Sequence, residues 1–183
     1  MFKAKIMSRD NVFFEQFDKD GNRKKLFQHN WLGKLLFKLG HDLQRFPFGS
    51  WVDQRQGANL ITTVGKAAIA DLVGGVNSIA VFDYMALGTG TTAAAAGDTA
   101  LETEITDSGL ERAQGTPTLV TTDTANDTLQ VVYQWTASGS KAITEAGLLN
   151  AAAAGTLLAH QVFSAINVTS SDTVQITWKI DID

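Results

Sequence analysis

The segment at residues 88–92, with the sequence GTGTT, is the first pattern in this chain that suggests chemistry, because glycine-rich turns can cradle phosphate groups. A P-loop needs a Lys-Ser/Thr pair at a fixed spacing, and a dinucleotide fingerprint needs a third glycine before a helix. The segment has neither feature. It therefore predicts a turn that follows a strand, and not a nucleotide site.

Acidic residues gather just after this segment, and carboxylates can hold calcium or act as a general acid and base. A calcium loop of the EF-hand type needs oxygen ligands at alternate positions, a central glycine and a terminal glutamate, which this segment lacks. Paired catalytic carboxylates must converge in space, and spacing along a chain does not establish that. We expect a solvated acidic edge that discourages unwanted strand pairing. It consists of Asp98, Glu102, Glu104, Asp107 and Glu111.

The chain has three histidines, His29, His41 and His160, and no cysteine. Disulfides and Cys-based zinc sites are excluded, and no HExxH pattern is present. No serine occupies a G-x-S-x-G elbow. We therefore predict a protein that is not an enzyme and binds neither a metal nor a cofactor, with its histidines at the surface or at an interface.

Lys19, Arg23, Lys24 and Lys25 form the densest basic cluster, and aromatic residues lie nearby in the sequence. Such a cluster can bind single-stranded nucleic acid by charge and stacking, dock on an acidic protein surface, or form a solvated hairpin tip. Eight of the ten phenylalanines lie within residues 1–58, a segment too short to bury them all. This crowding favours docking on a protein, followed by the solvated tip and then by nucleic acid.

Charge divides the chain into two parts. The segment at residues 1–58 holds eleven Lys/Arg against six Asp/Glu, and the remainder holds four against thirteen. Such asymmetry is typical of an interaction segment joined to a separate body. We predict an N-terminal docking arm at residues 1–58 and a single domain at residues 59–183. No apolar run approaches the roughly 20 residues that span a bilayer, so we expect no contact with a membrane.

The expected elements of the arm are a hairpin, a short helix and a linker. The hairpin covers residues 5–27 and turns at residues 18–22, where Asp, Gly and Asn favour a turn. The helix begins after the cap Asn30 and ends at Gly40, with an apolar stripe on one face. Residues 41–58 show no period and predict an extended linker that is docked through its aromatic residues.

The remainder of the chain predicts a mainly β fold. A helix is expected at residues 62–73, where Gly74 and Gly75 end it. Seven runs then suggest strands, and the clearest of them alternate with the period of two of an antiparallel sheet that has one buried face. The expected strands are residues 81–87, 110–113, 118–122, 129–136, 142–150, 155–163 and 174–182. We predict an antiparallel β-sandwich or jelly-roll-like body with one or two short helices and an extended N-terminal arm.

Several runs within residues 59–183, taken in their order, resemble small virion structural proteins of tailed bacteriophages. The resemblance rests on NLIT at residues 59–62, YMALGTGTT at 84–92, DTALETE at 98–104, ITEAGLLN at 143–150, GTLLA at 155–159, QVFSAINV at 161–168 and QITWKID at 175–181. Proteins of this family are described as head-decoration (cement) or tail-fibre proteins. The segment at residues 1–58 matches no family pattern.

The resemblance implies a virion protein that assembles in the cytoplasm of a bacterial host, which agrees with the absence of cysteine. We expect a capsid decoration or cement protein that docks on the major capsid protein or on tail proteins. We also expect a homo-oligomer, with a trimer favoured. The predicted docking residues are Phe13, Phe14, Phe17, Arg23, Lys24, Lys25, Trp31, Leu35, Phe46, Phe48 and Trp51.

Three alternatives stay open. The first is a tail-fibre, tail-adaptor or baseplate component. The second is a host-receptor or glycan-binding module that uses the loops at residues 91–98, 122–127 and 150–155, although these loops hold few aromatic residues to stack on sugars. The third is a hydrolase on a jelly-roll scaffold, against which the placement of the histidines counts.

Overall fold

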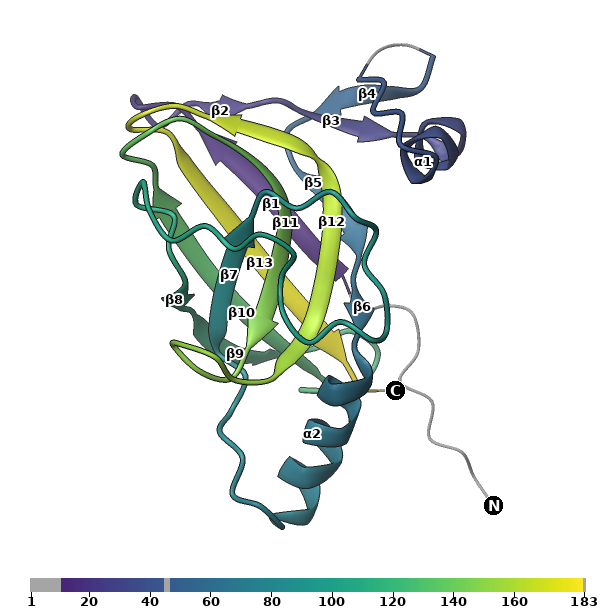
Figure 1. Cartoon of the computed structure of the whole chain (residues 1–183), viewed down its shortest axis with the longest axis vertical. Coiled ribbons are helices and arrows are strands. Elements are labelled where there is room, and N and C mark those ends of the chain that lie inside the picture. The colour runs from purple at the N-terminus through teal and green to yellow at the C-terminus, as the bar shows by residue number, and fades with distance from the viewer. Residues whose placement is uncertain (1–10, 45–46, 183) are drawn as a thin grey trace.

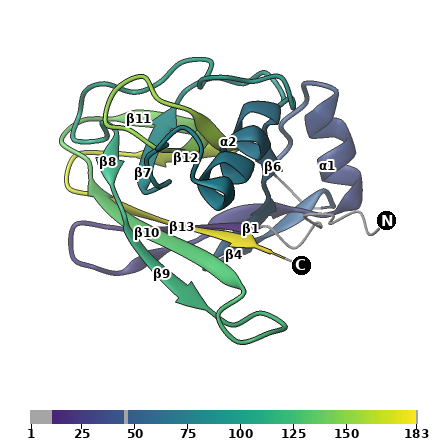
Figure 2. The ribbon, with the colours of Figure 1, turned by 90° about the horizontal axis from the view of Figure 1, so that it is seen from below.

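The computed structural model describes residues 11–44 and 47–182, and its body consists of two antiparallel sheets packed face to face (Figures 1 and 2). The first sheet has the order β2 (Arg23–Lys24), β1 (Asn11–Phe17), β13 (Thr173–Asp181), β10 (Thr128–Thr136) and β9 (Thr116–Val120), and β5 (Arg55–Ala58) also pairs with β1. The second has the order β6 (Leu60–Ile61), β12 (Leu157–Val168), β11 (Lys141–Leu149), β7 (Tyr84–Gly88) and β8 (Ala113–Gln114). The expected class, a mainly β antiparallel sandwich with two short helices, is confirmed.

Side chains that alternate along the strands fill the space between the two sheets. In β10 the side chains of Val131 and Trp135 are buried, and in β13 those of Ile176 and Trp178 are fully buried, as a period of two predicts. The facing strands of the second sheet contribute Met85, Leu87, Ile143, Leu148, Phe163 and Ile166 to the same core. The core therefore lies between the sheets and is shared by both.

Strand β1 is an integral part of the first sheet. It runs antiparallel to β13 along its whole length, and its other edge pairs with β5 and β2. Phe14 in β1 is 1% exposed and belongs to the central core. The predicted division at residue 58 therefore cuts through a sheet, because residues 11–17 and 55–58 belong to the sandwich. Residues 1–10, which include the start of the expected hairpin, lie outside the described residues.

A small lobe projects from one end of the sandwich (Figure 1). We define the lobe as residues 26–52, in which β3 (Leu26–His29) pairs with β4 (Gly49–Val52) and the helix α1 (Trp31–Lys38) lies between them in sequence. The expected cap is confirmed, since the Asn30 side chain accepts a hydrogen bond from the N–H of Gly33 at 2.9 Å. The expected extended linker at residues 41–58 holds two strands in its second half, β4 and β5, which are too short to show a period.

The second helix, α2 (Thr63–Gly74), lies at the opposite end of the sandwich from the lobe (Figure 1). Thr62 caps its N-terminus through a bond to the N–H of Gly65, and Gly75 ends it in the left-handed conformation with φ of 61°. Both ends agree with the prediction from sequence. Within the described residues, neither helix is long and apolar enough to cross a membrane.

Candidate functional site

The structure uses several of the predicted docking residues inside the protein itself. Phe14 fills the core, and Phe13 and Phe17 are half-buried under cations of the same sheet. Lys179 Nζ lies 5.6 Å from the centre of the Phe13 ring, and Arg23 Cζ lies 5.6 Å from that of Phe17. The prediction that these rings wait for a partner is corrected for Phe14, which the core already covers, whereas Phe13 and Phe17 lie half-buried on the opposite face of β1 and stay predictions.

The basic cluster is also partly consumed by internal ion pairs. Arg23 pairs with Glu15 at 2.9 Å, and Lys24 pairs with Asp172 at 2.7 Å. Lys25 is exposed. Glu15 and Asp172 thus neutralise two of the four cations in the cluster. The cluster offers less positive charge to a protein or nucleic-acid partner than the sequence suggested.

The remaining predicted docking residues lie on the lobe. Leu35 is 50% exposed and Trp51 is 56% exposed, while Phe48 is half-buried. Leu39, which ends α1, is 66% exposed and was part of the expected apolar stripe. Phe46 and the side chain of Trp31 lie outside the described residues. Within residues 11–44 and 47–58, the lobe is thus the part that offers large apolar groups to solvent.

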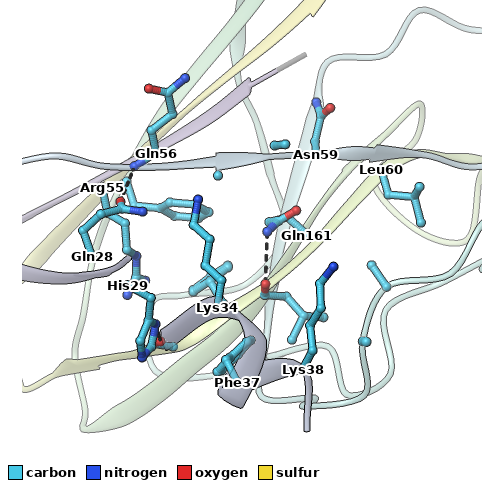
Figure 3. A pocket seen from close by; sticks show the side chains of 18 of the residues that line it. Gln28, His29, Lys34, Phe37, Lys38, Arg55, Gln56, Asn59, Leu60 and Gln161 are labelled. Carbon is cyan, nitrogen blue, oxygen red and sulfur yellow. Dashed lines mark hydrogen bonds between the residues drawn. The ribbon is translucent and has the colours of Figure 1, made fainter. Parts of the chain in front are cut away.

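A cavity of about 510 Å³ separates the lobe from the sandwich (Figure 3). Helix α1 forms one wall, β5 and β12 form another, and the loop that follows β7 contributes Thr91, Ala93 and Ala94. Lys34 and Lys38 rise from α1 toward β5, the strand that carries Gln56 (Figure 3). The described lining holds the charged side chains of Lys34, Lys38 and Arg55 and no carboxylate, although the whole chain has a net charge of −4.

Arg55 is the most unusual residue of this cavity because it is only 5% exposed. Its guanidinium carbon lies 5.1 Å from the ring centre of Phe163 and 5.5 Å from that of Phe14. Nη1 donates a long hydrogen bond of 3.4 Å to the carbonyl of Phe27, whereas Nε and Nη2 are buried without a hydrogen bond to any described residue. Burial lowers the pKa of Arg55 to about 10, against the opposing effect of Asp42, so the side chain stays charged at neutral pH.

His29 links the lobe to the sandwich beside this cavity. Its Nδ1 lies 2.9 Å from the hydroxyl of Ser164 in β12, and its Nε2 lies 3.2 Å from Asp42. Burial lowers the pKa of His29, with Asp42 opposing the shift, so the ring is mainly neutral at pH 7. Although the three residue types are those of a hydrolase triad, Ser164 is only 4% exposed within a strand, and its hydroxyl meets Nδ1 of His29 instead of Nε2, the nitrogen that faces the serine in such triads. The hydrogen bond between His29 and Ser164 instead joins the lobe to β12 of the sandwich.

A second buried network was not predicted from sequence, since His160 was expected at a surface or interface. His160 lies between two carboxylates, with Nδ1 2.7 Å from Asp98 and Nε2 3.1 Å from Glu145. Glu145 is fully buried and also accepts hydrogen bonds from three backbone N–H groups. The donors are Gly90 at 2.9 Å, Glu102 at 3.0 Å and Thr103 at 2.7 Å.

This network explains the glycine-rich run at residues 88–92. The run does surround an anion with backbone donors, but that anion is the carboxylate of Glu145. A Cβ atom at Gly90 would lie 2.6 Å from Oε1 of Glu145, which is closer than such atoms approach one another. The run does follow a strand, because β7 ends at Gly88, and it continues as a loop that bends at Thr92. The carboxylate already fills the place that a bound phosphate would need.

The acidic residues after this turn mostly anchor loops. Glu104 accepts a two-pronged bond from Arg112, with Nε at 2.8 Å and Nη2 at 2.6 Å. Asp107 pairs with Lys141 at 2.7 Å. The expected solvated edge is therefore correct for exposed Asp107, whereas half-buried Glu104 serves the packing of its own loop. Across residues 11–44 and 47–182, no group of three or more His, Asp or Glu side chains is arranged to hold a metal ion.

Comparison of the chain with protein-family models, with curated proteins and with solved structures found no match.

Proposed function

We propose that this chain is a non-enzymatic virion structural protein that docks on a neighbouring protein subunit through the lobe, with capsid decoration as its first role. The observation that carries the proposal is the exposure of Leu35, Leu39 and Trp51 on a lobe that projects from one end of the sandwich. Leu35 and Leu39 are four positions apart and therefore share one face of α1 and its end. The sequence resemblance of residues 59–183 supports the virion class.

The exposed apolar side chains of the lobe can form a contact that is weak on one subunit but is repeated on every subunit of a shell. Burying one large apolar side chain contributes about 1.5–3 kcal/mol before the costs of ordering and association are subtracted. A contact of this size becomes strong when symmetry repeats it on every subunit of a shell. Lys34 and Lys38 lie on the same helix and are exposed, so an acidic surface on the partner complements them.

Incorporation into particles tests this proposal. A triple variant, Leu35→Ser with Leu39→Ser and Trp51→Ser, is expected to fold and to be lost from purified particles. Leu119→Ser is the matched control, because Leu119 is 64% exposed but lies on β9, away from the lobe (Figure 1). Normal incorporation of the triple variant would contradict the proposal, as would loss of both variants.

Particles that lack the protein distinguish a head from a tail position. A decoration protein is expected to protect the shell, so such particles should lose resistance to heat or osmotic shock. A tail-fibre, adaptor or baseplate component would instead leave the heads intact and reduce infectivity. The predicted homo-oligomer, for which a trimer is favoured, is checked by light scattering of the purified protein.

A further inference from the structure

The guanidinium groups of Arg55 and Arg112 differ in whether a carboxylate binds them. Nε and Nη2 of Arg112 hold both oxygens of Glu104 at 2.8 and 2.6 Å. The same two nitrogens of Arg55 are buried beside the cavity and bond to no described residue. A planar carboxylate matches this fork, because its two oxygens accept two parallel N–H bonds.

The surroundings of Arg55 fix the direction of the fork. Phe14 and Phe163 lie within cation–π distance of the guanidinium, and their rings are 4.2 Å apart at an interplanar angle of 47°. Nη1 is directed to the carbonyl of Phe27. Asp42 acts on Arg55 electrostatically but does not bond to the two free nitrogens of the fork, so the fork is suited to a ligand whose carboxylate accepts both bonds.

The other lining residues indicate what the rest of the ligand is like. Both amide atoms of Asn59 are buried and have no hydrogen bond in the described chain, so they can donate to and accept from a hydroxyl group. Gln56 and Gln161 bring further amides to the same wall, and Phe37 offers an apolar face (Figure 3). The volume of about 510 Å³ lies within the range of small-molecule sites.

We propose that this cavity binds a small carboxylate that carries several hydroxyl groups, with the size and chemistry of a uronic acid, and that Arg55 holds the carboxylate. Lys34 and Lys38 add positive charge at the rim, and the amides of Asn59 and Gln161 bind the hydroxyls. This inference does not depend on where the protein is assembled.

Titration of the purified full-length protein with D-glucuronate and D-galacturonate, followed by heteronuclear NMR, tests the site. We expect shifts of the amide resonances of Asn59 and Gln161 and of Arg55 Nε. Glucose is the neutral comparison, inorganic phosphate is the tetrahedral comparison, and a hexaglutamate peptide presents carboxylates on a protein-like chain. The proposal is overturned if glucose or phosphate binds as tightly as the uronates, if hexaglutamate binds more tightly, or if the shifts map outside the cavity.

Three variants locate the binding energy. Arg55→Met keeps the length and apolar stem, and is expected to weaken uronate binding by about ten- to a hundredfold, the loss typical of hydrogen bonds to a charged partner. Arg55→Lys is expected to weaken it nearly as much, because an ammonium group lacks the fork. Lys66→Gln is the control, since Lys66 is exposed on α2 at the far end of the sandwich, and should bind as the unchanged protein does.

A rim variant keeps the test decisive even if substitution of the buried arginine prevents folding. Lys34 and Lys38 are exposed, so the double variant Lys34→Gln with Lys38→Gln should fold normally. It is expected to lose several-fold in affinity for uronates and to show a weaker dependence of affinity on salt. Unchanged affinity and salt dependence in this variant would overturn the assignment of the cavity.

Discussion

Phe14 of β1 packs on Phe163 of β12, and this contact joins the two sheets beside the junction between residues 1–58 and the rest of the chain. The rings are 4.2 Å apart and both are buried. Phe14, one of the predicted docking residues, is therefore part of the protein's own core. Within residues 1–58, the docking surface that we propose lies after β1, on the lobe.

Removing the Phe14 ring should destabilise the whole sandwich. For Phe14→Ala we expect a loss of about 3–5 kcal/mol in the free energy of unfolding, because a large buried ring is replaced by a cavity. Trp51→Ala should lower it by less, about 0.5–1.5 kcal/mol, because that side chain is 56% exposed and loses mainly its edge contact with the ring of Phe27. Urea titration followed by tryptophan fluorescence and circular dichroism measures both values. Similar losses in the two variants would contradict the distinction between core and lobe.

The buried pair Glu145 and His160 should make stability depend on pH in two directions. Burial disfavours charge on both groups, but their mutual hydrogen bond, together with backbone donors for Glu145 and Asp98 for His160, lowers the pKa of Glu145 and raises that of His160. The contribution of His160 is complete below its ordinary value of 6.5 and is lost as the pH rises through the raised pKa. That of Glu145 is complete above 4.5 and is lost as the pH falls through the lowered pKa.

Thermal unfolding across a pH series measures this effect. We expect the melting temperature to be highest between pH 4.5 and pH 6.5, the ordinary pKa values of the two groups, where both contributions are complete. It should fall at higher pH as His160 loses its proton. His160→Gln should be less stable at about pH 6 and should lack most of the alkaline decline. If the variant and the unchanged protein show parallel profiles from about pH 6 to about pH 9, the ionised pair has no role in stability.

Gly90 should be intolerant of any side chain. Gly90→Ala places a Cβ 2.6 Å from both Oε1 of Glu145 and Cβ of Glu102, so the carboxylate must move away from its donors. We expect a loss of about 1–3 kcal/mol, the cost of weakening hydrogen bonds to a buried acceptor, and faster hydrogen exchange at the amide of Thr103. Gly97→Ala is the control, because a Cβ there meets nothing within 4 Å. Equal stability of the two variants would refute this account of the turn.

The lobe should unfold separately when Gly33 is replaced. A Cβ at Gly33 would overlap the carbonyl oxygen of Phe48, which forces α1 away from the residues before β4. For Gly33→Ala we expect rapid hydrogen exchange throughout α1, with protection in β10 and β13 unchanged. Lys38→Ala, an exposed position of the same helix, should leave α1 protected. Loss of protection in the sandwich would show that the lobe and the sandwich are one cooperative unit.

The sequence is most informative where one physical signal dominates. Strands β10 and β13 alternate cleanly because one face is buried, while the cap Asn30 marks the start of α1 and the glycines at residues 74–75 mark the end of α2. The pairing of β1 with β13 could not be found this way, since alternation shows that a strand has a buried face but does not identify its neighbour. Crowded phenylalanines within residues 1–58 suggested an external partner, whereas the other sheet covers Phe14.

The candidate site was less predictable for a related reason. Arg55 follows no motif, and its significance comes from burial between Phe14 and Phe163, which are distant in sequence. Glu145 and His160 also face each other only because β11 and β12 are paired. One signal was available: the glycines at residues 88–92 indicated that something approaches the backbone there. The sequence pattern could not reveal that the approaching group belongs to the protein.

The antiparallel pairing of β1 with β13 also constrains how the protein is made. As the ribosome emits the chain, β1 leaves the exit tunnel long before β13, its neighbour in the sheet. Until β13 emerges, the inner faces of β1 and β10 have no central strand between them. The first sheet should therefore close late and slowly, as expected for contacts between remote parts of a chain. A nascent chain with exposed apolar strands is prone to aggregate, so we expect a chaperone to bind it.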